Sequence, residues 1–274
     1  MIRPAGGKSY PMNAMTWAPP LAKALATALL VVSASVVAEA LGPFWGALIA
    51  SLPVSAGPAY VFLAMQHGAD FVATSALSSF AANAATGLFL TVYGVLAGRK
   101  SPAQSLGTAV LAWFAASLAI QQAPWTPLTA LLLNLAVYGG GFARLRIVMS
   151  TVSKPPLRPG RRWVDLVVRA VAVAGFVSCV IAISTVAGPA ATGIAAVFPI
   201  SLISLFVIVR PRIGGAASSL LAANALRPML GFGAMLLGLH LAIRLYGIEV
   251  AFGVALLVSG GWSVALLLLR RRQQ

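Results

Sequence analysis

Residues 42–55 read GPFWGALIASLPVS, and residues 188–201 read GPAATGIAAVFPIS. Both stretches open with Gly-Pro and close with Pro-x-Ser, and they lie 146 positions apart. At the same spacing, Trp17 pairs with Trp163. Tryptophan, Gly-Pro and Pro-x-Ser matches are harder to obtain by chance than matches between alanines. The pattern therefore predicts that the chain carries two copies of one structural unit.

The composition favours a membrane protein. Of the 274 residues, 60% are hydrophobic and only 8% are charged, with a net charge of +15. A water-soluble domain carries about 25% charged residues, and a disordered chain has low hydrophobicity. The basic residues are scattered among apolar runs, so they form no solvated face for nucleic acid. The sequence therefore predicts an all-α, polytopic membrane protein that does not bind nucleic acid.

Nine stretches are apolar enough to cross a membrane, since a spanning helix needs about 20 apolar residues. They cover residues 17–41, 43–65, 71–97, 103–120, 127–148, 163–187, 189–209, 215–243 and 248–269. Turn-forming residues separate most of them, including Gly188-Pro189 and Pro211. We therefore expect a bundle of about nine transmembrane helices.

The distribution of lysine and arginine predicts the orientation in the membrane, because cytoplasmic loops are enriched in both residues. With the C-terminus in the cytoplasm, thirteen of the 19 cations lie on the cytoplasmic side. These are Arg99, Lys100, Arg144, Arg146, Lys154, Arg158, Arg161, Arg162, Arg210, Arg212, Arg270, Arg271 and Arg272. Nine spans then place the N-terminus outside. We expect a multi-pass protein of the bacterial cytoplasmic (inner) membrane.

Five predicted spans separate equivalent points of the two copies. Because five is odd, the second copy enters the membrane from the opposite side, which makes an inverted-topology repeat like that of many secondary transporters. Beyond Gly68 and Gly214 the register slips, since AANA at 81–84 resembles AANA at 222–225. The predicted units are a flexible N-terminal tail (1–16), a first four-helix repeat (17–121), a linker helix with a basic cytoplasmic loop (122–162), and a second, inverted four-helix repeat (163–270).

A family resemblance rests on the proline motif of each copy. The second copy contains GIAAVFPIS at 193–201, followed by a basic turn and a long helix, and the first contains GALIASLPVS at 46–55. Over about 50 residues in each copy, these features resemble the GlpM-like family of small four-helix bacterial inner-membrane proteins. In architecture alone, the plan of four, one and four helices is similar to the route from small multidrug-resistance proteins to drug/metabolite transporters. The resemblance implies a duplicated and fused membrane protein, and it implies no mechanism.

Paired prolines are the first candidate site. Pro53 and Pro199 each lie about ten residues into a predicted span, near the bilayer midplane at 1.5 Å per residue. Proline breaks the backbone ladder, and freed carbonyls at this depth are tolerated where they are buried in protein or line a cavity. Ser55 and Ser201 follow two residues later, where a hydroxyl could serve the broken turn or a ligand. The alternative is an ordinary kink in helices two and seven.

Arg227 is the sharpest single candidate. A central arginine costs at least about 2.5 kcal/mol on insertion scales, so we expect it to face the bundle interior or a wet cavity. Asn224 lies three residues earlier on the same helical face, and together the two would hold an anionic group. The alternative is an arginine satisfied by carbonyls near Pro228, which is predicted to split the helix. Asn83 is the asparagine of AANA in the first copy.

Few other residues suggest chemistry. Glu39 is the deepest carboxylate and His240 lies within a span, so either could couple transport to protons. The alternatives are an interfacial carboxylate and a packing histidine. Cys179 is alone in an apolar run. The sequence contains no catalytic constellation, no metal-ligand cluster and no cofactor motif.

Together these features predict a secondary transporter or a lipid-linked flippase. The substrate is expected to be an anionic small molecule or lipid-linked molecule bound near the midplane, and the chain, a monomer or homodimer, would contact membrane lipids. The alternative is a non-transporting scaffold or accessory subunit of a membrane or envelope-assembly complex. That alternative predicts a packed interior without a cavity and a partner that co-purifies. An intramembrane enzyme is the third reading, and it lacks catalytic residues.

Overall fold

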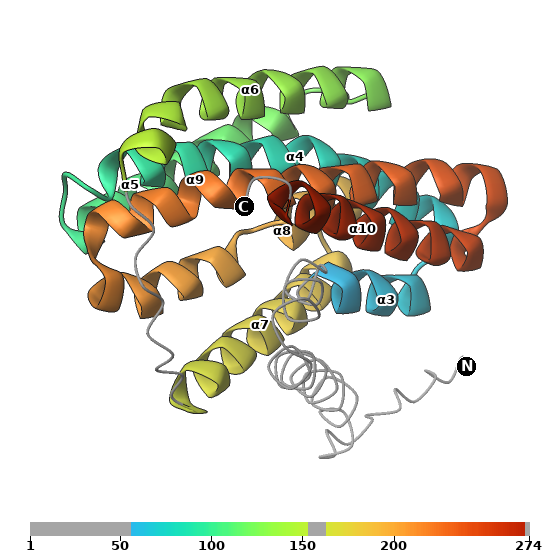
Figure 1. Cartoon of the computed structure of the whole chain (residues 1–274). Coiled ribbons are helices and arrows are strands. Elements are labelled where there is room, and N and C mark those ends of the chain that lie inside the picture. The colour runs from blue at the N-terminus through green and yellow to red at the C-terminus, as the bar shows by residue number, and fades with distance from the viewer. Residues whose placement is uncertain (1–55, 153–162, 272–274) are drawn as a thin grey trace, which may run out of the picture.

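The computed structural model describes residues 56–152 and 163–271, where every regular element is an α-helix (Figure 1). The helices are α3 (Ala56–Gln66), α4 (Ala69–Leu96), α5 (Pro102–Gln121), α6 (Pro127–Thr151), α7 (Trp163–Ser184), α8 (Gly188–Ala196), α9 (Ile200–Tyr246) and α10 (Ile248–Arg271). Five helical stretches in these ranges are long and apolar enough to cross a membrane. The predicted all-α class is therefore confirmed for the described residues. The first predicted span and most of the second lie outside them, so the total of nine stays a prediction.

Helix α4 forms the centre of the bundle. It packs against α5, α6, α8 and α9, and most of its residues from Val72 to Gly94 are buried. Its sequence is rich in alanine, serine and glycine, which allow neighbouring helices to approach closely in a membrane protein. In Figure 1, α4 lies between α6 on one side and α8 on the other.

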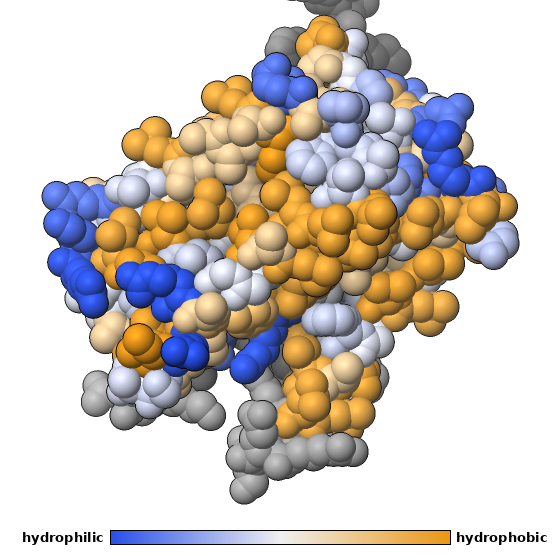
Figure 2. All heavy atoms as spheres, turned by 90° about the horizontal axis from the view of Figure 1, so that it is seen from above, coloured by the Kyte–Doolittle hydropathy of each residue, from blue (hydrophilic) through white to orange (hydrophobic). Residues whose placement is uncertain are grey.

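The surrounding helices expose apolar side chains. Leu111 of α5, Leu128 of α6 and Leu257 of α10 are all exposed, and apolar residues cover much of the face shown in Figure 2. Exposed apolar area on this scale marks a surface that contacts lipid or another protein. The bundle therefore has a central helix rich in small residues and an outer surface suited to hydrocarbon.

The helix directions follow from contacts along α4. Gly94 packs against Leu145 of α6, and Asn83 bonds to Asn134 of α6, so α4 and α6 run parallel. Helix α9 runs the other way, because Gly215 packs closely against the carbonyl of Ala97 at the end of α4, whereas His240 bonds to the carbonyl of Ala73 near its start. Helix α6 is thus parallel and α9 antiparallel to α4, as expected for helices that cross a membrane in alternating directions.

Helix α9 contains one sharp break. Gly214 has φ 80° and ψ 173°, so α9 consists of a segment over residues 200–213 and a long helix over residues 215–246. The turn predicted at Pro211 therefore falls three residues later, since only glycine adopts this conformation readily. Pro228 was predicted to split the long helix, and that prediction is wrong because the helix continues through it.

The two ends of the bundle differ in the charges that the structure describes. Arg99 and Lys100 follow α4, and Arg146 lies near the parallel end of α6. Asp70 begins α4 and Glu249 begins α10, at the opposite end. Arg244 also lies at this end, 3.6 Å from Asp70, so the separation of charge is partial and the orientation stays a prediction.

Candidate functional site

Four polar side chains form a row on one face of α4. Ser75, Ser79, Asn83 and Thr86 follow one another at intervals of four, four and three residues, which keeps them on one helical face. Each is at most 3% exposed. We call these four residues the α4 polar row. Burying polar groups costs free energy unless they are hydrogen-bonded, so their partners decide what the row does.

The two serines fasten α8 to α4. Ser75 donates to the carbonyl of Pro189 at 2.9 Å, and Ser79 donates to the carbonyl of Gly193. Because the single hydroxyl proton of Ser79 is used in this way, Tyr60 of α3 donates to the Ser79 oxygen, at 2.6 Å. Gly193 lies so close to the backbone of Ser75 that a side chain would not fit there. Three helices therefore meet at one buried chain of hydrogen bonds.

Thr86 forms a hydrogen bond with the backbone at the helix break beside Pro199. Helix α8 ends at Ala196 and α9 begins at Ile200, as the proline predicted. Thr86 donates to the carbonyl of Val197 at 3.3 Å and accepts from the indole N–H of Trp113 at 3.2 Å. The sequence suggested that Ser201 supplies a hydroxyl to the broken turn. In the structure, Thr86 of α4 supplies it.

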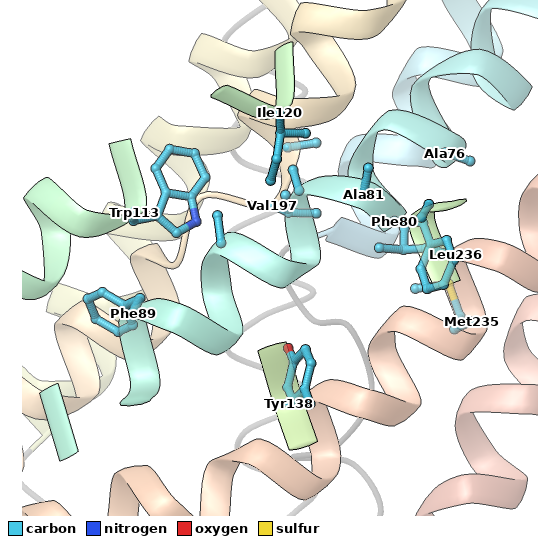
Figure 3. Packing of buried hydrophobic residues seen from close by; sticks show 14 of the residues in the cluster. Ala76, Phe80, Ala81, Phe89, Trp113, Ile120, Tyr138, Val197, Met235 and Leu236 are labelled. Carbon is cyan, nitrogen blue, oxygen red and sulfur yellow. The ribbon is translucent and has the colours of Figure 1, made fainter. Parts of the chain in front are cut away.

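Ser201 itself lies one residue inside α9, and its carbonyl accepts from the hydroxyl of Ser204 at 3.0 Å. Ring contacts surround the break. Phe198 packs edge-on against Trp113, with ring centroids 5.0 Å apart. Figure 3 shows Trp113 and Tyr138 approaching α4 from two different sides. The break is therefore enclosed by side chains of α4 and α5.

Asn83 lies where α4, α6 and α9 cross. Its amide nitrogen donates to Oδ1 of Asn134 at 3.1 Å and to the carbonyl of Met229 at 3.2 Å. Tyr138 donates to the backbone carbonyl of Asn83 at 3.2 Å. Asn83 Oδ1 is buried and has no hydrogen-bond partner. The crossing thus holds one acceptor that nothing in the described structure uses.

Arg227 does not lie in the packed core of the described helices, so of its two expected positions the wet cavity stays a prediction. Its side chain is exposed, whereas the preceding Leu226 is fully buried. One residue turns a helix by about 100°, so α9 directs Leu226 into the core and Arg227 away from it. Asn224 is half-buried and is not part of the Asn83 network. The indole N–H of Trp262 donates to the carbonyl of Arg227 at 3.0 Å.

Of the remaining candidate residues, the structure describes His240. Pro53, Ser55 and Glu39 lie outside the described residues. His240 is buried, and its Nδ1 lies 2.7 Å from the carbonyl of Ala73, to which it donates because a carbonyl only accepts. His240 therefore ties α9 to the start of α4.

Arg210 is a buried residue that the sequence reading assigned only to the cytoplasmic surface. It is 7% exposed, and its guanidinium reaches carbonyls at the end of α4. The polar row was also missed, apart from Asn83. Its signal was present in ATSALSSFAANAAT at residues 73–86, where polar residues recur at helical spacing.

Within residues 56–152 and 163–271, no three His, Cys, Asp or Glu side chains gather. The candidate site described here is therefore built from hydroxyls, amides and backbone carbonyls. No family model, curated protein or solved structure matches the chain.

Proposed function

We propose that this protein is a secondary transporter or lipid-linked flippase of the bacterial cytoplasmic membrane, built as an inverted repeat. The crossing of α4 and α9 carries the proposal. Asn83 bonds to Met229, and these residues lie 146 positions apart, which is the spacing of the sequence repeat. When two repeats are related by a two-fold axis, equivalent residues contact each other only at that axis. If the axis lies in the membrane plane, the equivalent helices α4 and α9 run antiparallel.

The helix starts add support. Helix α4 begins at Ala69 and the long part of α9 at Gly215, while α5 begins at Pro102 and α10 at Ile248. Both pairs are 146 residues apart. The register slip inferred from the AANA motifs therefore does not shift the helix boundaries. This constant spacing is what two copies of one fold would produce.

The broken helix supports a transport role. Many transporters bind substrate where discontinuous helices expose backbone groups near the midplane. The break between α8 and α9 lies beside the α4 polar row, next to the proposed axis. In this proposal, the end of the bundle with Arg99 and Lys100 faces the cytoplasm, and each half derives from a GlpM-like unit.

The expected anionic substrate depends on Arg227 in the bundle interior or in a wet cavity. Because Arg227 is exposed in the described structure, the wet cavity is the position in which it would hold the anionic group of a small-molecule or lipid-linked substrate. No enzymatic step is proposed, since the polar row has no nucleophile paired with a base.

A disulfide lock tests the proposal. A Cβ built on Gly98 lies 3.5 Å from the hydroxyl of Ser219, so cysteines at these positions would join α4 to α9 at the Arg99 end. In a Cys179→Ser background, Ser79→Cys then reports access to the α4 polar row. A transporter predicts that an impermeant maleimide labels residue 79 from the Arg99 side in oriented proteoliposomes, and that oxidising the lock abolishes labelling from that side while labelling from the opposite side remains.

The control is Gly98→Cys without its Ser219 partner, which should leave labelling at residue 79 unchanged under oxidation. Labelling that is absent in every redox state would contradict alternating access. It would favour the scaffold alternative, which the packing of three hydroxyls of the polar row against backbone carbonyls also fits. A partner that co-purifies in equal amount would then be expected.

A further inference from the structure

The orientation of the Asn83 amide is fixed by its surroundings. Its Nδ2 faces two acceptors, Asn134 Oδ1 and the carbonyl of Met229. The Asn134 amide is fixed too, because its Nδ2 donates to the carbonyls of Phe80 and Ala130, at 2.7 and 2.9 Å. Flipping either amide would place oxygens against oxygens. Asn83 Oδ1 is therefore a genuine unpaired acceptor.

Such an atom requires an explanation, since buried polar atoms in folded proteins nearly always have a partner. Asn83 is completely buried, so bulk water does not supply one. Gly233 faces the same side chain, and a Cβ there would lie 2.8 Å from Asn83 Nδ2. The absence of a side chain at Gly233 leaves the amide in place. The crossing is thus arranged around an asparagine whose oxygen points at no protein donor.

The neighbours of this oxygen indicate the charge of its partner. Asn83 is surrounded by Phe80, Asn134, Tyr138, Met229 and Gly233, all of which are uncharged. An ion without a counter-charge is costly in such an interior. A carboxylate or phosphate would also repel the unpaired oxygen, because both groups are acceptors. The partner is therefore an uncharged hydrogen-bond donor.

We infer that Asn83 Oδ1 binds a hydroxyl group of an uncharged, polyol-like substrate as it crosses between α4 and α9. A hydroxyl is a small neutral group that donates to such an oxygen, and its own oxygen can accept from a neighbouring donor. The inference rests on the proposed transport function and replaces its anionic substrate with a neutral one. In the described conformation the site is closed, so binding requires α9 to move away from α4.

Three six-carbon compounds test the charge preference. Sorbitol is neutral, gluconate carries a carboxylate, and glucamine carries an ammonium group at neutral pH, while the rest of the chain is the same. With purified protein in liposomes, we expect sorbitol uptake to exceed gluconate uptake by about tenfold, because a site built for a hydrogen bond rejects a mismatched group. Uptake into empty liposomes gives the background.

A variant at Asn83 connects the selectivity to this oxygen. Asn83→Leu should reduce sorbitol uptake to background. Tyr93→Phe is the matched control, since Tyr93 is another buried polar side chain of α4, ten residues away from Asn83. It should leave the preference unchanged.

Two results would overturn the inference. One is gluconate uptake equal to or faster than sorbitol uptake, and the other is no sorbitol uptake above background. If Asn83→Leu does not fold, Gly233→Ala replaces it, because its methyl group crowds the same amide, and normal sorbitol selectivity in that variant would also count against the inference. The proposed function fails separately, through the labelling experiment at residue 79, which needs no substrate.

Discussion

The guanidinium of Arg210 in α9 donates to the carbonyl oxygen of Ala97 at the end of α4, at a distance of 2.8 Å. The same nitrogen donates to the carbonyl of Lys100 at 2.6 Å. The last carbonyls of a helix have no partners within the helix, and the negative end of its dipole attracts cations. Arg210 also lies over Tyr93, 6.0 Å from the ring centroid. A charge that suggests a surface residue therefore caps the central helix from inside the bundle.

We predict that Arg210→Lys lowers the free energy of unfolding by about 2 kcal/mol, because lysine does not reproduce the planar arrangement of donors. Arg99→Lys, an exposed change of the same kind, should shift it by less than about 0.5 kcal/mol. Denaturant unfolding in detergent, followed by circular dichroism, measures both. Equal stability of the two variants would contradict the capping role.

Thr86→Val tests the link between α4 and the helix break. The substitution retains the shape of the side chain and leaves the carbonyl of Val197 and the indole N–H of Trp113 without their shared hydroxyl. We expect a loss of about 2 kcal/mol of stability. Ser117→Ala removes a buried hydroxyl that has no partner, so it should change stability by less than about 0.5 kcal/mol.

Gly68 and Gly214 occupy equivalent positions of the proposed repeat and differ in conformation. Gly214 has φ 80° and ψ 173°, whereas Gly68 has φ −70° and ψ 170°, which any residue adopts. We predict that Gly214→Ala costs about 2 kcal/mol. Gly68→Ala should change stability by less than about 1 kcal/mol, since nothing lies within 4 Å of its Cβ position. Similar losses of stability in both variants would mean that the two breaks require glycine equally.

The orientation predicts the outcome of reporter fusions. A fluorescent protein fused after Gln274 should fluoresce, because the C-terminus is expected in the cytoplasm. Alkaline phosphatase inserted at Ala123, between α5 and α6, should be active, since that loop is expected on the outer side. Inactive phosphatase at Ala123 together with a dark C-terminal fusion would reverse the orientation.

The helices were largely predictable from local sequence. Apolar runs and turn residues placed α5 and α6 within a few residues of their observed bounds, and the break at Pro199 followed from the missing N–H of proline. The repeat spacing of 146 was also visible in residues 42–55 and 188–201. The break after Pro211 also fell between the predicted spans 189–209 and 215–243. The local signal was misleading at Pro228, since a proline weakens a helix without ending it when neighbouring contacts hold the chain in place.

The candidate site was predictable only in part. Asn83 was chosen for its motif, and the structure places it at the centre of three helices. Arg227 was chosen for the cost of a central charge, and a difference of one residue around α9 directs it away from the packed core that buries Leu226. Arg210 illustrates the converse, because its burial depends on the distant end of α4.

The sequence by itself determined that this is a strongly apolar, helical chain with a repeated proline motif, because composition and local backbone preferences act over a few residues. Only the tertiary structure decided which polar groups are satisfied. Ser75, Ser79 and Thr86 find their acceptors more than a hundred residues away, and Asn83 Oδ1 finds none. Hydrogen-bond partners depend on how helices cross, and residues far apart in the chain set that crossing.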